Sequence, residues 1–183
     1  KRAKILGKLG IFTVQSLLAH YPARYTDFSQ PMPLADAPYG ENCVVKAEIY
    51  GKTSGVRISG GRQIFKVSAG DDTGSLTITF FSPYPLNNLN IGESYLFYGK
   101  VNGQFGAREM ASPEFILANS EKPLVPVYHL TQGVTSKYIG SCVKNAFNAL
   151  EGKIVDPMPN DLIKSYNLPD YRNALYQIHF PTE

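Results

Sequence analysis

The segment Gly74–Tyr84, GSLTITFFSPY, combines a β-strand pattern with an aromatic end. Its apolar residues alternate with polar ones, the period-two pattern of a strand that buries one face, and they are Leu76, Ile78 and Phe80. This register places Phe80 in the core and leaves Phe81 on the polar face. Pro83 ends the ladder because it lacks an N–H donor, and Tyr84 follows it. The segment therefore predicts a strand with two large rings at its exposed end.

A large ring on a polar strand face has two interpretations. It could pack under a neighbouring loop as an ordinary apolar patch. It could also be a platform for nucleic-acid bases, because every base has a π-face that an exposed ring can accept. The segment by itself leaves both interpretations open.

Other strand patterns surround this one. They lie at Asn42–Thr53, Arg62–Ala69, Glu93–Val101 and Gln104–Met110, with a short edge piece at Pro113–Leu117. A short helix or turn is expected at Leu86–Ile91, between the third and fourth strands. Five short strands with regularly spaced turns predict a closed OB-fold barrel, a fold that binds oligonucleotides on its strand 2–3 face and adjoining loops.

The flanks of the barrel have helical patterns. Lys1–His20 is expected to form two short helices, the second capped by Thr13. The proline-rich connector Tyr21–Tyr39 is expected to contain no regular element. An extended linker at Glu121–Tyr128 precedes three expected helices, which are Thr135–Leu150, Asn160–Tyr166 and Asp170–His179.

The expected fold class is therefore mainly β with flanking helices (α+β). We divide the chain into a helical lead-in with its connector at 1–41, the five-stranded OB-fold barrel at 42–118, and a linker with C-terminal helices at 119–183. Because the chain starts at Lys1 without Met, we interpret it as a piece of a longer protein.

Composition excludes several classes of protein. A length of 183 residues, 43% of them hydrophobic, suits one medium domain with helical appendages. No apolar run approaches the roughly 18–20 residues of a membrane helix, and no secretory leader is visible, so we expect no membrane partner and a cytoplasmic location. Cys43 and Cys142 are far apart and outside any CxxC, which suggests neither a zinc site nor a disulfide framework.

The net charge of +3 is a weak bias, but one segment is clearly basic. The stretch from Lys46 to Lys66 contains five basic residues and only one acidic residue, Glu48. The basic residues are Lys46, Lys52, Arg57, Arg62 and Lys66. An ordinary solvated face is one interpretation. The other is a phosphate-binding face, for which the candidate DNA-backbone contacts are Arg57, Arg62, Lys66, Lys100 and Lys46.

Catalytic motifs are not found. Tyr50–Thr53 reads YGKT and resembles the end of a P-loop, but Lys46 stands where that signature needs glycine. The three histidines have no partners at metal-ligand spacing. We therefore assign no catalytic residue, no metal ligand and no cofactor to this chain.

Several runs together resemble a known family. LGIFTVQSLLAHYPARYTD, FFSPYPLNNLNIGESYLFYGKV, GQFGAREMASPEF and PLVPVYHLTQGVTSKYIGSCVKNAF are similar to the N-terminal part of the bacterial ATP-dependent DNA helicase RecG family. LPDYRNALYQIHFP looks like the segment before the first motor domain of that family. The resemblance covers essentially the whole chain, and the combination of PxRYxD, the FF tip and PVYxLTxG makes it specific.

The resemblance implies a wedge domain, an OB-fold on a helical lead-in that sits at the branch point of stalled replication forks and Holliday junctions in recombination and repair. The wedge would split the strands while the motor pulls duplex past it, using ATP and Mg²⁺. The aromatic tip of the family stacks on unpaired bases, a role that falls here on Phe81 and Tyr84, with Phe80 as the fallback. The tip departs from relatives that have an asparagine-containing segment where Ser82 and Pro83 stand.

The resemblance also implies the partners of the chain, which are branched DNA and the C-terminal motor domains of the same protein, in a monomer. The motor is absent from this sequence, so the chain should not unwind DNA by itself. A different function also fits the residues. The barrel could be a protein-interaction module that uses Phe81 and Tyr84 as its hot spot.

Overall fold

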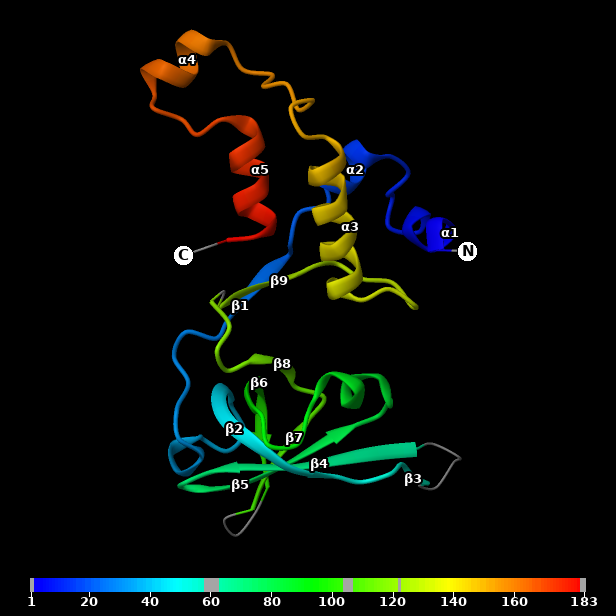
Figure 1. The fold of residues 1–183 in the computed structure, drawn as a ribbon, viewed down its shortest axis with the longest axis vertical. Helices are drawn as coiled ribbons and strands as arrows, with labels where there is room; N and C mark the ends of the chain where they lie inside the picture. Colours follow the sequence, from blue (N-terminus) through cyan, green and yellow to red (C-terminus); the bar gives the residue numbers. More distant parts are fainter. Residues whose placement is uncertain (1, 58–62, 104–106, 122, 182–183) are drawn as a thin grey trace. The chain divides into compact units, whose positions relative to one another are not determined.

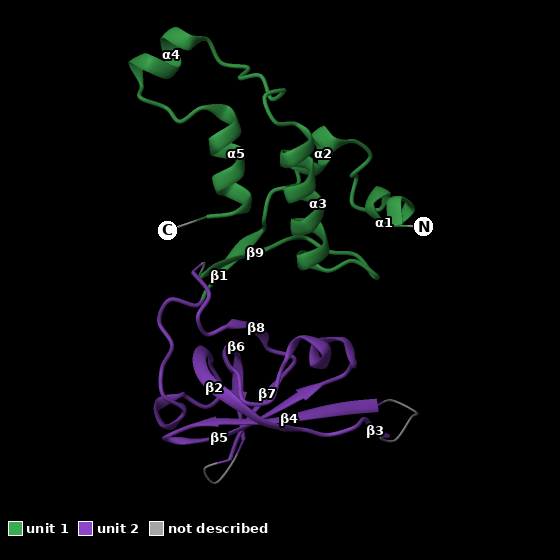
Figure 2. Cartoon of the chain, in the orientation of Figure 1, with its two compact units in different colours: residues 1–27, 122–183 green, residues 28–121 purple. Residues whose placement is uncertain are grey.

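The computed structural model describes residues 2–57, 63–103, 107–121 and 123–181. The chain forms two compact units, residues 1–27 with 122–183 (unit 1) and residues 28–121 (unit 2) (Figure 2). The N-terminal and C-terminal parts of the chain therefore belong to the same unit. The division expected from the sequence, at 1–41, 42–118 and 119–183, treated these two parts as separate.

Unit 2 is a closed barrel (Figure 1). Its strands follow one another around the barrel in the order β2 (Asn42–Lys52), β4 (Gln63–Asp71), β5 (Gly74–Phe80), β7 (Arg108–Ala111) and β6 (Ser94–Asn102). Pairing of β6 with β2 closes the ring, and β5–β7 is its parallel pair. The predicted five-stranded OB-fold is confirmed.

Short elements complete unit 2. They are β3 (Val56–Arg57), which pairs with β4, β8 (Glu114–Leu117), which pairs with β6, and the 3₁₀ helices η1 (Leu34–Asp36) and η2 (Tyr84–Asn88). The helical turn expected between the third and fourth strands is thus present as η2, and it begins two residues earlier than predicted.

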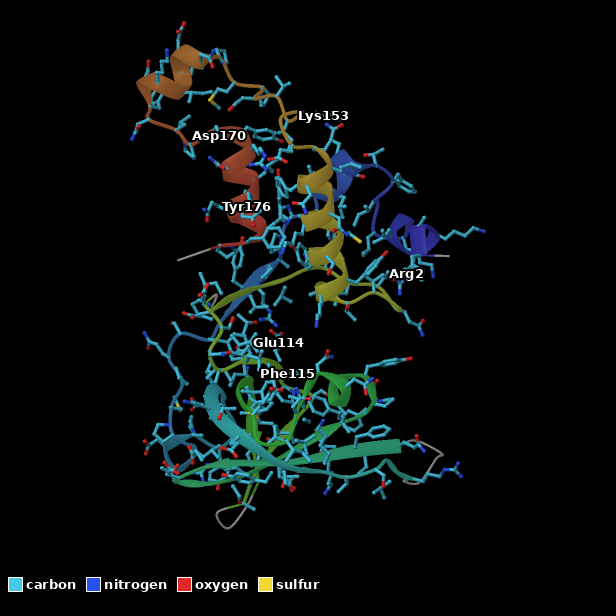
Figure 3. The ribbon with its side chains drawn as sticks, in the orientation of Figure 1. Arg2, Glu114, Phe115, Lys153, Asp170 and Tyr176 are labelled. Carbon is cyan, nitrogen blue, oxygen red and sulfur yellow. The ribbon has the colours of Figure 1, made fainter. Side chains whose placement is uncertain are left out.

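The alternation along β5 is confirmed by burial. Leu76, Ile78 and Phe80 are at most 2% exposed. Phe80 lies opposite Phe65 of β4, and its ring meets the ring of Phe115 edge-on, with centroids 6.2 Å apart. Phe115, labelled in Figure 3, also contacts Tyr95 and Phe97. Fully burying one such ring stabilises the fold by about 1.5–3 kcal/mol.

Asp71 fastens the turn between β4 and β5. Its carboxylate accepts hydrogen bonds from the backbone N–H groups of Leu34 (2.8 Å), Thr73 (2.8 Å) and Gly74 (2.9 Å) and from the Thr73 hydroxyl (2.6 Å). Partial burial by itself would raise the pKa of this carboxyl, but the four hydrogen bonds outweigh it and lower the pKa. The turn is therefore tied to the connector through an ionised side chain.

The described residues of unit 1 form seven elements. They are α1 (Arg2–Gly7), α2 (Val14–Leu18), β1 (Arg24–Asp27), β9 (Leu124–Val127), α3 (Ser136–Ala149), α4 (Asn160–Ser165) and α5 (Tyr171–His179). The core-facing stripe predicted for the long helix is buried, with Ile139, Val143, Ala146 and Phe147 in its core. Thr13 caps α2 as predicted, accepting a hydrogen bond from the Ser16 N–H. No helix in the described part of the chain is long and apolar enough to cross a membrane.

The expectation that Tyr21–Tyr39 lacks regular structure is wrong. Arg24–Asp27 forms β1, which pairs antiparallel with β9, and Leu34–Asp36 forms η1. The prolines of this connector lie outside β1, so every residue of the strand keeps its N–H donor. The partner strand lies almost a hundred residues further along the chain, which local sequence patterns do not reveal.

His179 links three segments of unit 1 and is fully buried. Its Nε2–H donates to the Leu18 carbonyl oxygen (2.9 Å), and its Nδ1 accepts from the Tyr128 hydroxyl (3.0 Å). Burial lowers the pKa of this imidazole; the Leu18 hydrogen bond opposes the shift, and the nearby charge of His20 adds to it. The same burial raises the pKa of Tyr128 to about 12, so its hydroxyl stays a donor.

The Asp71 clamp predicts a loss of stability in Asp71→Asn. The amide cannot accept all four hydrogen bonds, so the free energy of unfolding should fall by about 1–2 kcal/mol at pH 7. Because the pKa of Asp71 is lower in the folded protein than in the unfolded chain, the wild type should lose this part of its free energy of unfolding as the pH falls below about 4. The variant has no carboxyl group at this position, so its free energy of unfolding should fall less over the same range. Urea denaturation at pH 7 and pH 3 checks both, with Asp72→Asn as control; equal losses in the two variants would contradict the clamp.

The buried His179 predicts an acid-sensitive unit 1. Its folded pKa lies below the unfolded value of about 6.5, so the unfolded chain binds the proton first as pH falls. Stability should therefore decline from about pH 6.5 downward. Thermal unfolding followed by far-UV circular dichroism should show a flatter pH profile for His179→Phe. The exposed-residue control His129→Gln should keep the wild-type slope, and an unchanged slope in His179→Phe would refute the assignment.

Candidate nucleic-acid interface

The end of β5 exposes two aromatic side chains. Phe81 is 62% exposed and Tyr84 is 78% exposed, whereas Phe80 is 2% exposed. Phe80 therefore has no free ring face, and of the three candidate stacking residues only Phe81 and Tyr84 remain. Their surfaces form what we call the tip, residues 81–84.

The backbone after the tip is tightly folded. Pro83 precedes η2, its carbonyl accepts a hydrogen bond from the Leu86 N–H (3.1 Å), and Leu89 is fully buried. At the far side, the Tyr95 hydroxyl accepts from the Asn90 N–H (2.9 Å) and donates to Glu93 Oε2 (2.7 Å). The Tyr95 hydrogen bond, with a second from Asn90, lowers the pKa of Glu93. The segment thus leaves the tip along a fixed path.

Lys52 anchors this segment to β2. Its Nζ donates to the carbonyl oxygens of Leu86 (2.9 Å) and Leu89. A cation at the carbonyls that end η2 complements their partial negative charge. Lys52 belongs to the basic segment recognised in the sequence, but its ammonium is engaged inside unit 2.

A groove of about 510 Å³ opens beside the tip. Its lining residues come from β3, β4 and the tip, and they are Arg57, Gln63, Phe65, Phe81 and Pro83. The groove therefore places one guanidinium, one carboxamide and two rings next to one another. Sequence reasoning named Arg57 and Phe81, and it missed Gln63 and Phe65.

The structure separates the predicted phosphate-contacting residues. Lys66 is exposed on β4 opposite Thr79, two residues before Phe81, and Arg57 lines the tip groove. Lys100 is exposed and lies opposite Asn42, the first residue of β2, whereas Lys52 is the last residue of that strand. Arg62 lies outside the described residues. Arg57 and Lys66 are therefore the described basic candidates nearest the tip.

Lys46 has a different environment. It lines a second groove of about 470 Å³ together with three carboxylates, those of Glu48, Asp71 and Asp72. A phosphate backbone approaching this groove would meet more negative than positive charge. Lys46 is thus the least suited of the predicted backbone contacts.

The chemistry available at the tip is that of binding. Exposed rings can stack on bases, and Arg57 and Lys66 can neutralise phosphates. Among the described residues, no group of three or more His, Cys, Asp or Glu side chains is placed to hold a metal ion.

The roles of the missed residues are not visible in the sequence. On the predicted second strand, Gln63 and Phe65 share the face of the buried Val67 and not the outward face of Lys66, so the alternation gave no reason to place them at a binding surface. The role of Lys52 has no local signal either, because the carbonyl oxygens that it binds are more than thirty residues away.

Comparison with known proteins finds one family repeatedly. A family model for the RecG wedge domain matches residues 1–150. The ATP-dependent DNA helicase RecG of Streptococcus pneumoniae serotype 4 is 29% identical over 185 aligned residues, covering 99% of this chain and 27% of the relative. The protein of the same name from Escherichia coli K12 is 31% identical over 187, covering 96% and 26%.

A solved structure supports the same fold. A RecG protein bound to a three-way DNA junction matches with a TM-score of 0.80 at 23% identity, over 98% of this chain and 25% of that one. This chain therefore spans about a quarter of the length of its relatives. Because the family model covers most of the sequence, the chain belongs to the RecG wedge domain family.

Proposed function

We propose that this chain is the strand-splitting wedge of an ATP-dependent DNA helicase and binds branched DNA at stalled replication forks and Holliday junctions. The observation that supports this most directly is the pair of exposed rings, Phe81 and Tyr84, just after β5, whose last residue, Phe80, is buried in the core. A rigid barrel can thereby present aromatic surface to a base pair at the branch point.

The energetics fit a wedge that traps open pairs. Stacking on an aromatic side chain is worth about 1–3 kcal/mol per base. A DNA stacking step is worth about 1.4 kcal/mol on average. One ring can therefore replace the stack that a base loses when its pair opens, but two rings cannot drive opening over many pairs.

The work of separating many pairs must come from elsewhere in the parent protein. We infer that the partners of this chain are the C-terminal motor domains of the same polypeptide, which would bind ATP and Mg²⁺. The coverage of about a quarter of each relative leaves room for such domains. This chain would contribute binding and geometry, and no residue of it is assigned to ATP hydrolysis.

Electrostatic attraction would hold the DNA at the tip without regard to sequence. Arg57 and Lys66 are the candidates for this contact, and Lys100 and Arg62 are further candidates. Each neutralised phosphate contributes about −0.9 to the slope of log K against log salt concentration. Binding should therefore weaken steeply as salt rises.

Removal of both tip rings should abolish fork preference. In Phe81→Ala/Tyr84→Ala, the loss of about 1–3 kcal/mol of stacking per ring, and so of at least about 2 kcal/mol for the two rings, should weaken fork binding by roughly 30-fold or more. Affinity for linear duplex should stay unchanged, because the phosphate contacts remain. Fluorescence anisotropy with forked, linear and single-stranded DNA measures each affinity.

The matched control for this test is Phe12→Ala, which removes an 81% exposed ring from unit 1. It should leave the preference intact. A double tip variant with the full preference would overturn the assignment to Phe81 and Tyr84. A wild-type chain that binds no fork even at low salt would favour the protein-interaction module instead.

Lys66 and Lys52, both from the basic stretch between Lys46 and Lys66, should affect the salt dependence of DNA binding differently. Lys66→Met should reduce the magnitude of the salt slope by about 0.9, because one phosphate contact is lost. Lys52→Met should leave the slope unchanged and lower the ratio of fork to duplex affinity, because its ammonium fixes the segment after the tip. Salt titrations of both variants check this, and a reduced slope in Lys52→Met would contradict the anchoring role.

A further inference from the structure

Charge is divided unevenly between the two units. Unit 2 carries seven basic and nine acidic residues, a net charge of −2, whereas unit 1 carries eleven and six, a net charge of +5. Within unit 1, residues 1–26 and 122–150 contain eight basic residues and no acidic one. The positive charge of the chain therefore belongs to unit 1, and not to the barrel that presents the tip.

The exposed side of α3 arranges part of this charge in a row. Lys137, Ser141, Lys144 and Asn148 are all exposed, and because they recur at intervals of four, three and four residues they share one face of the helix. We call these four residues the α3 stripe. The buried apolar residues of the same helix lie on its other side, so the stripe is left to solvent.

Helix α1 adds cations beside the start of the α3 stripe. The Arg2 guanidinium lies over the Tyr138 ring, 5.0 Å from its centroid, and Tyr138 directly follows Lys137 (Figure 3). Such a contact between a cation and an aromatic face holds the guanidinium in place without neutralising it. Lys4 and Lys8, one helical turn apart, are exposed as well. The first turn of α3 is thus surrounded by positive charge.

The composition of the α3 stripe suits the DNA backbone better than a protein surface. Interfaces between proteins usually have an apolar centre rich in aromatic side chains, and the stripe has no apolar member. Interfaces with DNA are more polar and much more positively charged. Lysine, serine and asparagine side chains are all common partners of phosphate oxygens.

The spacing of the two lysines fits this partner. Lys137 and Lys144 are seven residues apart on one helix, which separates them by about 10 Å along its axis. Phosphates of one DNA strand follow one another at about 3.4 Å along the duplex axis. The stripe can therefore reach about three successive phosphates.

We propose that the α3 stripe, with the neighbouring cations of α1, binds the phosphate backbone of a duplex arm of the branched DNA. The inference rests on the proposed function, since a branched DNA brings duplex arms as well as unpaired bases to the chain. The site is separate from the tip, whose rings need base faces that a duplex keeps stacked. Unit 1 would thus supply affinity for duplex, and the tip would supply the preference for a branch point.

Removal of the two lysines of the stripe tests this. In Lys137→Met/Lys144→Met, the slope of log K against log salt concentration should fall in magnitude by about 1.8 for linear duplex, because two phosphate contacts are lost. Affinity for linear duplex at about 0.1 M salt should fall by about tenfold or more. The ratio of fork to duplex affinity should keep its wild-type value, because the tip is intact. Fluorescence anisotropy with linear and forked DNA over a salt series measures all three quantities.

The matched control is Lys153→Met/Lys164→Met. Both lysines are exposed in unit 1, and this variant removes the same charge from the chain. They lie outside the α3 stripe, in the part of unit 1 that also contains acidic residues; Figure 3 labels Lys153 beyond the end of α3. The control should keep the wild-type slope and duplex affinity. Circular dichroism and thermal melting confirm that each variant is folded.

The outcomes distinguish this inference from the proposed function. If the Lys137 and Lys144 variant keeps the wild-type slope, or if the control lowers it as much, the α3 stripe is not the duplex site, and the wedge remains as long as the double tip variant loses fork preference. If polyglutamate of equal charge binds the wild type at least as tightly as duplex and releases in the stripe variant, the stripe serves an acidic protein and the duplex assignment is overturned. If the wild type shows no fork preference while the stripe variant still loses duplex affinity, the proposed function fails and the stripe remains a DNA-backbone site.

Discussion

The burial of Phe80 is the constraint on which the exposed end of β5 depends. Its ring packs among the aromatic side chains inside the barrel, and adjacent positions on a strand point to opposite faces. The next residue must therefore leave the core, and Pro83 then ends the ladder. An outward ring at this position follows directly from an inward ring one residue earlier. A one-residue slip of β5 would bury Phe81 and expose its three core residues, which the packing forbids.

The segment that follows the tip is held at two places. The Lys52 ammonium of β2 binds the Leu86 and Leu89 carbonyl oxygens, and the Tyr95 hydroxyl accepts from the Asn90 N–H where the chain returns to β6. In both contacts, a polar side chain from a strand binds backbone carbonyl or N–H groups that have no partner in a β-ladder. The base stacking proposed for the tip would benefit from this rigidity, because an ordered ring loses less conformational entropy when a base stacks on it.

Sequence patterns predicted much of unit 2 because its strands alternate over short distances and end at turn residues. Local patterns predicted the buried residues of β5 and the 3₁₀ turn that follows it. In unit 1, a local pattern likewise predicted the long helix with its apolar stripe. The β1–β9 pair and the engagement of Lys52 were not predictable, since both join residues far apart in the chain. For the candidate interface, alternation separated Phe80 from Phe81, but the groove depends on how β3 and β4 align. Charge counting likewise treated Lys46, Lys52 and Lys66 as equivalent, although their surroundings differ.

The pairing of β1 with β9 makes the barrel an insertion. Asp27 and Leu124 are partners, so the chain enters and leaves unit 2 from neighbouring positions of one ladder. Tension applied between the two ends of the chain acts first on unit 1, where His179 fastens α5 to the Leu18 carbonyl. The ladder would then open one residue pair at a time from Arg24 and Val127, and only afterwards would load reach the barrel. A wedge inserted in this way is shielded from mechanical force transmitted along its own polypeptide.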